Sequence, residues 1–200
     1  MRPARPLSAA LAAALLLPGA PPASAGLGPL HRPSALPWAD TVQLRTFDAR
    51  HGQLLAAHLV ITAHARTRIS VENTSDTPQL VQAGSTTRVR VLLPSGQTLA
   101  TVPFDAGDQW VLAPYDGVLD FAGSSGRSAD HSARSRAEVV ITDPALLLYF
   151  LSPPGGGGRV ELPAAAIGFA DVLGGDGLSR EVSLEAGLRV RVDYVFAPWS

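Results

Sequence analysis

The sequence predicts an all-β fold, a single antiparallel β-sandwich of the immunoglobulin-like or jelly-roll-like kind, and three observations support this. Short apolar or alternating runs recur along the chain, and turn residues separate them. No run combines a helical period with capping residues over ten or more positions. In the last run, from Leu188 to Phe196, apolar residues take one parity and charged residues the other. Such alternation is typical of antiparallel sheets with one solvated face.

Twelve runs have the composition of strands. In chain order they are 41–47, 53–62, 67–72, 87–93, 98–104, 109–112, 118–121, 137–142, 146–151, 159–162, 166–172 and 188–196. The connections are rich in Gly, Pro, Asn, Asp and Ser, which favour turns. We therefore expect turns at 73–78, 94–96, 105–108, 142–144 and 174–177, and two longer loops at 123–136 and 153–158.

Residues 1–25 have the composition of a cleaved secretory signal peptide. Arg2 and Arg5 supply a positive start, and an apolar run over 7–17 follows. Ala23-Ser24-Ala25 offers small residues at the cleavage positions, so we expect the cut between Ala25 and Gly26. An apolar run of about ten residues is half of what a bilayer span needs. No later segment is longer, so we expect no transmembrane segment in the mature chain.

The mature chain has the length of one domain. Residues 26–37 contain three prolines and two glycines, which predicts an extended leader. The remaining residues, 38–200, form the predicted sandwich domain.

The composition excludes several chemistries. The chain has no cysteine, which excludes disulfides, thiolate metal sites, cysteine nucleophiles and a lipidated cysteine. It has no lysine either, which excludes Schiff-base catalysis and lysine isopeptide crosslinks. Removing Arg2 and Arg5 from the 16 basic residues leaves 14 against 17 acidic ones, a formal charge of −3. Without a basic stripe, nucleic acid is not an expected partner.

Three blocks of sequence resemble the choice-of-anchor E family of exported bacterial domains. The first is Phe47-Asp48 with Gly52-Gln53-Leu54, followed downstream by residues 71–75, VENTS. The second and most specific is residues 116–126, DGVLDFAGSSG, and the third is the closing Val-rich strand at 190–196. The resemblance implies an extracytoplasmic β domain of unestablished function, with no catalytic residues or cofactor to carry over.

The resemblance also bears on the expected location of the protein. Many relatives end in an apolar helix and a basic tail that act as a sorting signal, whereas this sequence closes with residues 195–200, VFAPWS. We therefore expect a secreted or periplasmic protein without a C-terminal anchor.

Two aspartates in the central block are weak calcium candidates. Asp116 and Asp120 flank a short apolar run, and Asp105 and Asp108 lie upstream. Calcium needs six to eight oxygen ligands, and aspartate in a turn more often bonds its own backbone two residues on. The turn at 174–177, GGDG, is a single copy and has no repeat. We assign no metal or other cofactor, and keep Asp116 and Asp120 as the calcium candidates.

Histidine and serine chemistry also has candidates. His58 and His64 share a parity, but six residues of strand separate them by about 20 Å, too far for one zinc ion. Ser124, Ser125, Asp130 and His131 are close in sequence and have the residue types of a hydrolase. They lack the G-x-S-x-G turn and its strand-to-helix context. We therefore assign no catalytic residue.

Aromatic residues offer a further alternative. Trp38, Trp110 and Trp199, with Tyr115, are a candidate platform for sugar rings, against the simpler expectation of core packing.

The preferred interpretation is a non-enzymatic, exported interaction or structural module with an unknown protein or polysaccharide partner at the cell envelope. A glycan- or calcium-binding module is the alternative, and a hydrolase would require turnover that is lost on changing Ser125 or His131.

Overall fold

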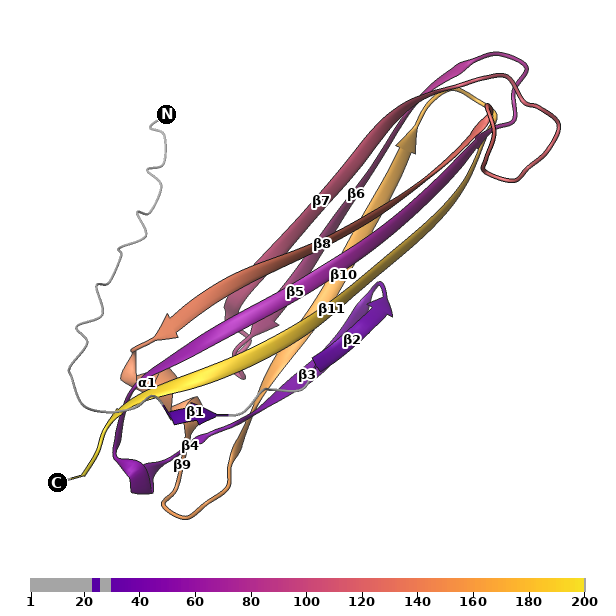
Figure 1. Cartoon of the computed structure of the whole chain (residues 1–200). Helices are drawn as coiled ribbons and strands as arrows, with labels where there is room; N and C mark the ends of the chain where they lie inside the picture. Colours follow the sequence, from indigo (N-terminus) through magenta and orange to yellow (C-terminus); the bar gives the residue numbers. More distant parts are fainter. Residues whose placement is uncertain (1–22, 26–29, 200) are drawn as a thin grey trace, which may run out of the picture.

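The computed structural model describes residues 23–25 and 30–199, which form an elongated β-sandwich (Figure 1). In sheet A, the strand order is β1 (Ala23–Ala25), β11 (Leu178–Ala197), β5 (Gln53–Asn73) and β8 (Gly126–Ile141), and β2 (Leu30–Ala35) also pairs with β11. In sheet B, the order is β3 (Trp38–Arg45), β10 (Arg159–Leu173), β6 (Gln79–Leu92) and β7 (Thr98–Leu112). All pairs in both sheets are antiparallel, and the predicted all-β sandwich is confirmed.

Several strands are longer than the sequence predicted. β5 joins the runs 53–62 and 67–72, β7 joins 98–104 and 109–112, and β10 joins 159–162 and 166–172. The turn expected at 105–108 is wrong, because β7 continues through it with Asp105 opposite Thr86 and Asp108 opposite Ala83. Pairing with β6 satisfies the backbone here and overrides the local turn preference of Asp and Gly.

Three other local predictions are wrong. Residues 118–121 lie in the loop between β7 and β8, and most of the loop predicted at 123–136 belongs to β8. Residues 146–151 are mainly helical, in α1 (Pro144–Leu147) and η2 (Leu148–Phe150). Asp143 caps α1 by accepting a bond from the Ala145 amide at 2.8 Å, and Pro144 opens its first turn. Asp followed by Pro is a helix-start signal that the apolar run obscured.

The N-terminal predictions are only partly within the described residues. Residues 1–22 and Gly26 lie outside them, whereas Ala25 lies in β1, opposite Val192. Residues 30–35 of the predicted leader form β2. The Leu36 amide donates to the Leu184 carbonyl at 3.0 Å. The leader is therefore paired with the sandwich from Leu30 onward.

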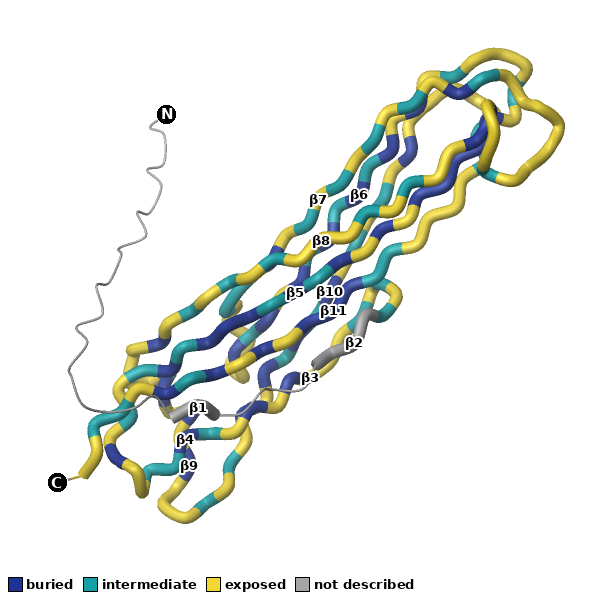
Figure 2. Tube along the Cα trace, viewed as in Figure 1, coloured by how far each residue is buried: buried dark blue, intermediate teal, exposed yellow. Residues whose placement is uncertain are grey.

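The sandwich interior contains two apolar clusters of unequal size. The larger one includes Leu59, Ile61, Phe150, Leu162 and Val190. The smaller one consists of Ile69, Val71, Val81, Ala83, Leu112 and Val172. Three buried hydroxyl residues, Thr67, Ser85 and Thr87, lie between the two clusters along β5 and β6. Figure 2 shows the resulting alternation of buried and exposed positions along the strands.

The two ends of the sandwich differ in their connections (Figure 1). The loops at 74–78, 113–125 and 174–177 meet at one end, which we call the loop end. Backbone bonds tie these loops together, from Thr74 N to Gly177 O at 2.7 Å and from Tyr115 N to Ser75 O at 2.8 Å. At the C-terminal end lie η1 (Ala49–His51), α1, η2 and a short parallel pair, β4 (Phe47–Asp48) with β9 (Leu151–Ser152). No helix in the described part of the chain is long and apolar enough to cross a membrane.

Candidate functional site

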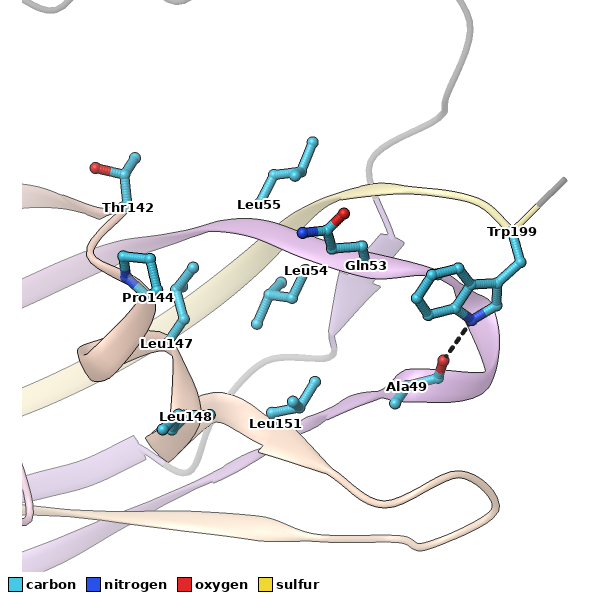
Figure 3. Close-up of a pocket in the computed structure, with 11 residues that line it drawn as sticks. Ala49, Gln53, Leu54, Leu55, Thr142, Pro144, Leu147, Leu148, Leu151 and Trp199 are labelled. Carbon is cyan, nitrogen blue, oxygen red and sulfur yellow. Dashed lines mark hydrogen bonds between the residues drawn. The ribbon is translucent and has the colours of Figure 1, made fainter.

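An apolar cavity of about 370 Å³ lies at the C-terminal end of the sandwich (Figure 3). We call it the C-terminal pocket. Its walls come from η1 and the start of β5, from α1 and η2, from β9 and from Trp199, two residues after β11. They are Ala49, Gly52, Gln53, Leu54, Leu55, Thr142, Pro144, Leu147, Leu148, Leu151 and Trp199.

Trp199 is fixed in this pocket although it is the last described residue. Its indole Nε1 donates to the Ala49 carbonyl at 2.9 Å, while the side chain stays 64% exposed. Gly52 allows this end of the chain to approach, since a Cβ on Gly52 would lie 2.0 Å from the Ala197 carbonyl oxygen. The φ of Gly52 is also +145°, which favours glycine.

Asp48 holds the turn whose Ala49 carbonyl binds Trp199. Its carboxylate caps η1 by accepting from the Arg50 amide at 2.9 Å, and it also accepts from Arg50 Nε and from the Gly155 amide. Hydrogen bonds from the Arg50 amide and then from the Arg50 side chain lower the pKa of Asp48 to about 2. These bonds of the charged Asp48 side chain therefore fix the position of the Ala49 carbonyl that binds Trp199.

Large apolar side chains surround the mouth of the pocket. Leu148 is 68% exposed, and Leu55 and Leu151 are each nearly 40% exposed. Exposed apolar side chains gathered around a concave surface mark binding sites more often than scattered ones do. The pocket is therefore chemically suited to an apolar group.

A second cavity, of about 550 Å³ and mainly polar, opens between the edge strands β7 and β8. We call it the seam cavity. The buried hydroxyls of Thr67, Ser85 and Thr87 line it, and Ser85 Oγ donates to Thr67 Oγ1 at 3.1 Å. Small side chains at Ala65, Ala106 and Ala133 leave the space open.

A contact between His131 and Asp108 joins the two sheets beside this cavity. His131 Nε2 on β8 lies 2.5 Å from Asp108 Oδ2 on β7, and both side chains are about 30% exposed. Asp105 on the rim accepts from Thr86 Oγ1 and pairs with Arg88. The bond from Thr86 and then the one from Arg88 lower the pKa of Asp105. The seam thus offers hydroxyls, carboxylates and one imidazole.

The structure does not assemble the hydrolase candidates. Ser125 precedes β8 and His131 lies five residues beyond the first residue of that strand, which is about 16 Å. His131 pairs with Asp108, and Asp130 pairs with Arg66 at 3.1 Å. The Ser124 carbonyl accepts a bond from the Ala113 amide. These residues are therefore distributed along one strand and serve separate contacts.

The calcium candidates Asp116 and Asp120 each bond the backbone two residues on, which was the expected alternative to a metal site. Asp116 accepts from the Val118 amide at 3.0 Å, and Asp120 accepts from the Ala122 amide at 2.9 Å. Within residues 23–25 and 30–199, no three His, Asp or Glu side chains form a metal cluster. His58 and His64 share the outer face of β5, and His58 pairs with Glu138 at 3.1 Å.

The four aromatic candidates do not form one platform. Trp38 packs against the larger cluster and donates to the Ala186 carbonyl at 3.1 Å, while Trp110 packs against the smaller cluster. Tyr115 lies in the loop at 113–125, where its amide bonds the Ser75 carbonyl. Of the tryptophans, Trp199 lines the C-terminal pocket (Figure 3).

Sequence reasoning missed Glu72. This residue is fully buried near the loop end, and neither carboxylate oxygen has a hydrogen-bond partner among the described residues. Its neighbour Asn73 is also fully buried but makes four side-chain hydrogen bonds. The sequence signal was weak, because Glu72 occupies the parity of β5 that faces solvent elsewhere.

The chain has little similarity to known proteins. No model of a protein family matches it, and no curated protein does. Among solved structures, the Gt strain of infectious bursal disease virus shows 9% identity and a TM-score of 0.15 over 86% of this chain and 43% of that chain. The Gx strain shows 7% identity and a TM-score of 0.13 over 84% and 41%. The chain thus spans less than half the length of these structures, and scores this low support no conclusion about fold or function.

Proposed function

We propose that this protein is an exported, non-enzymatic interaction module of the bacterial cell envelope, and that it binds a partner protein through the C-terminal pocket. The signal-like N-terminus and the resemblance to choice-of-anchor E domains support export. The single observation that carries the binding site is the group of exposed apolar side chains, Leu55, Leu148, Leu151 and Trp199, around an apolar cavity.

The chemistry of the pocket favours an apolar peptide segment as its ligand. A volume of about 370 Å³ is near the lower limit for a small-molecule site and can hold one or two large side chains. Gln53 and Thr142 at the wall add polar groups that can bond a peptide backbone. Trp199 supplies the type of residue that most often dominates a binding interface.

Selection from a display library of random peptides tests this proposal. We expect selected peptides to carry one or two large apolar residues and to lose at least tenfold in affinity when Leu148→Asp is introduced. The matched control is Val140→Asp, because Val140 is 61% exposed on β8 and is not part of the pocket. Peptides that bind both variants equally well would contradict the proposal.

A second candidate function is glycan binding in the seam cavity, which the three buried hydroxyls favour. Sugars are recognised by such hydroxyl and carboxylate groups because each offers donors or acceptors to a ligand rich in hydroxyls. Titration calorimetry with a glycan panel tests it. We expect saturable heat that Thr67→Val abolishes and that Thr62→Val, on the outer face of β5, leaves unchanged. A binding heat that Thr67→Val leaves unchanged would contradict glycan binding in the seam cavity.

A further inference from the structure

Glu72 places an unpaired carboxylate in the interior of the loop end. The residue has no exposed surface, and neither Oε1 nor Oε2 has a hydrogen-bond partner among the described residues. An ionised carboxylate without partners is costly to bury, by several kcal/mol after relaxation. No group among the described residues compensates such a charge, so a bound proton or a bound ligand is required.

The loop at 113–125 forms the lid over this carboxylate. Gly126 lies opposite Glu72 in the β5–β8 pair. A Cβ on Gly126 would lie 2.4 Å from Glu72 Oε2, 2.3 Å from Ala122 N and 2.5 Å from Phe121 C. The Glu72 carboxylate and the Phe121–Ala122 peptide therefore both lie close to Gly126, which has no side chain. Phe121 has a φ of +56°, a conformation that residues other than glycine rarely adopt.

Several contacts pin the loop in this position. The Gly126 amide donates to the Ala122 carbonyl at 2.9 Å, and the Asn73 amide donates to the Ser125 carbonyl at 2.8 Å. The nearby guanidinium of Arg127 donates to the Gly123 and Gly126 carbonyls, and not to Glu72. The strained Phe121 is therefore held by the surrounding bonds, which is typical of functional sites.

The surroundings of Glu72 are rich in oxygen. Ser70 and Ser128 share a hydroxyl bond of 2.8 Å on the same outer face, and Ser128 Oγ also reaches the Phe121 carbonyl. Asp120 uses Oδ1 to bond the Ala122 amide, next to Glu72 Oε2. Asp116 Oδ2 lies 3.1 Å from the Cβ position of Gly123 in the same loop. Carboxylate, hydroxyl and carbonyl oxygens are the ligands of hard cations.

We infer that the loop end binds a calcium ion, with Glu72 as its buried ligand and the loop at 116–125 as its cover. Glu72 has no exposed surface, so a ligand of its carboxylate must be small. Calcium fits better than magnesium because it accepts irregular sets of carbonyl, hydroxyl and carboxylate oxygens. We assign Glu72 as the bidentate ligand and Asp120, whose Oδ1 already bonds the Ala122 amide, as the acidic ligand from the loop. The inference does not rest on the proposed partner binding, since the two sites lie at opposite ends.

Calcium titration of the purified full chain, freed of metal by a chelator, tests this inference. Extracellular calcium modules have dissociation constants on the order of 1 mM or below. At about ten times that constant, we expect the unfolding midpoint to rise by about 3 to 6 °C, with saturable heat in calorimetry. Magnesium at matched ionic strength should give a smaller rise.

Variants locate the ion. Glu72→Gln should abolish the rise, and its midpoint without calcium should equal or exceed that of the wild type, because an uncompensated charge is removed. The control Glu161→Gln changes an exposed glutamate on β10 and should keep the full rise. Asp120→Asn, in the exposed loop, should weaken calcium affinity at least threefold and tests the site even if Glu72→Gln does not fold.

Two results would overturn the inference. One is a wild-type midpoint and calorimetric heat that 10 mM calcium leaves unchanged, which would mean that the carboxyl is buried as the neutral acid. The other is a calcium response that persists in full in Glu72→Gln.

Discussion

The three hydroxyl residues in the middle of the sandwich divide it into two regions that are stabilised in different ways. Towards the C-terminal end, aliphatic and aromatic residues such as Phe150 and Tyr194 fill the interior. Phe47 stacks edge-on against Tyr194 with 5.8 Å between ring centroids. Towards the loop end, only six buried apolar residues form a cluster, and hydrogen bonds around Asn73 order the loops.

This difference indicates how each end can respond to its surroundings. Apolar burial depends little on ions or pH, so the C-terminal end can present a fixed pocket. Hydrogen bonds and buried charge contribute only when every group is satisfied. The loop end is therefore the part whose stability should depend on a bound ion, while the opposite end supplies most of the folding free energy.

The same substitution in each region gives the largest expected effect. Ile61 and Ile69 both face inward from β5 and are both fully buried, in the larger and the smaller cluster respectively. We expect Ile61→Ala to lower the free energy of unfolding by about 4 kcal/mol and Ile69→Ala by about 3 kcal/mol. The smaller cluster borders polar groups and can relax or admit water. Urea unfolding measures both, and a larger cost for Ile69→Ala would contradict the assignment of the main core.

Asn73 tests the hydrogen-bonded region directly. Its side chain donates to the Thr77 and Ala113 carbonyls at 2.8 and 2.7 Å, and its oxygen accepts from the amide and hydroxyl of Ser75. We expect Asn73→Ala to cost about 3 kcal/mol, because several buried groups lose their partners.

Gln79→Ala is the control for this prediction, because the Gln79 side chain also bonds the loops, at Ser75 Oγ, the Asp176 carbonyl and the Gly175 amide, but is partly exposed. It should cost less than about 1 kcal/mol in the same urea experiment. Similar losses in the two variants would show that the Asn73 bonds do not order the loop end.

The strands and their packing were largely predictable from the sequence, because alternation fixes which side chains share a face. The parity of β11 correctly predicted an inward row from Leu188 to Tyr194. Strand lengths were not predictable, because turn residues such as Asp105 and Gly107 continue β7 once β6 pairs with them. Small polar residues in β8 looked like a loop for the same reason. In both strands, pairing with a strand that lies far away in the sequence outweighed the local preference for a turn.

The candidate sites were less predictable than the strands. Trp199 was chosen for its aromatic ring, but its role in a pocket depends on Ala49 and the helical segment, which only the fold brings near. Asp116 and Asp120 were chosen for their charge, whereas Glu72, the buried ligand of the inferred calcium site, lies on β5, far away in the sequence. The parity of β5 did not predict that Glu72 is buried, because its burial comes from a loop about fifty residues later.

Gly126 provides a smaller test of the lid over Glu72. A methyl group there would overlap Glu72 Oε2 and Ala122 N, so Gly126→Ala should lower the free energy of unfolding by about 2 kcal/mol through overpacking. Gly157→Ala, at the C-terminal end, meets nothing within 4 Å and should be neutral within about 0.5 kcal/mol. Thermal unfolding compares them. Equal unfolding midpoints for the two variants would mean that the loop at 113–125 moves aside without loss of stability.

Acid titration gives the smallest expected effect and concerns the C-terminal end. The folded-state pKa of Asp48 is about 2, below its ordinary value of 3.8, so its ionised form favours the folded chain. The stabilisation is complete above about pH 4 and is lost as the pH falls through 2. The midpoint difference between wild type and Asp48→Asn should therefore be constant from pH 7 to 5 and shrink towards zero near pH 2. A gap for Asp48→Asn that is unchanged at pH 2 would mean that the Asp48 charge does not stabilise the turn beneath Trp199.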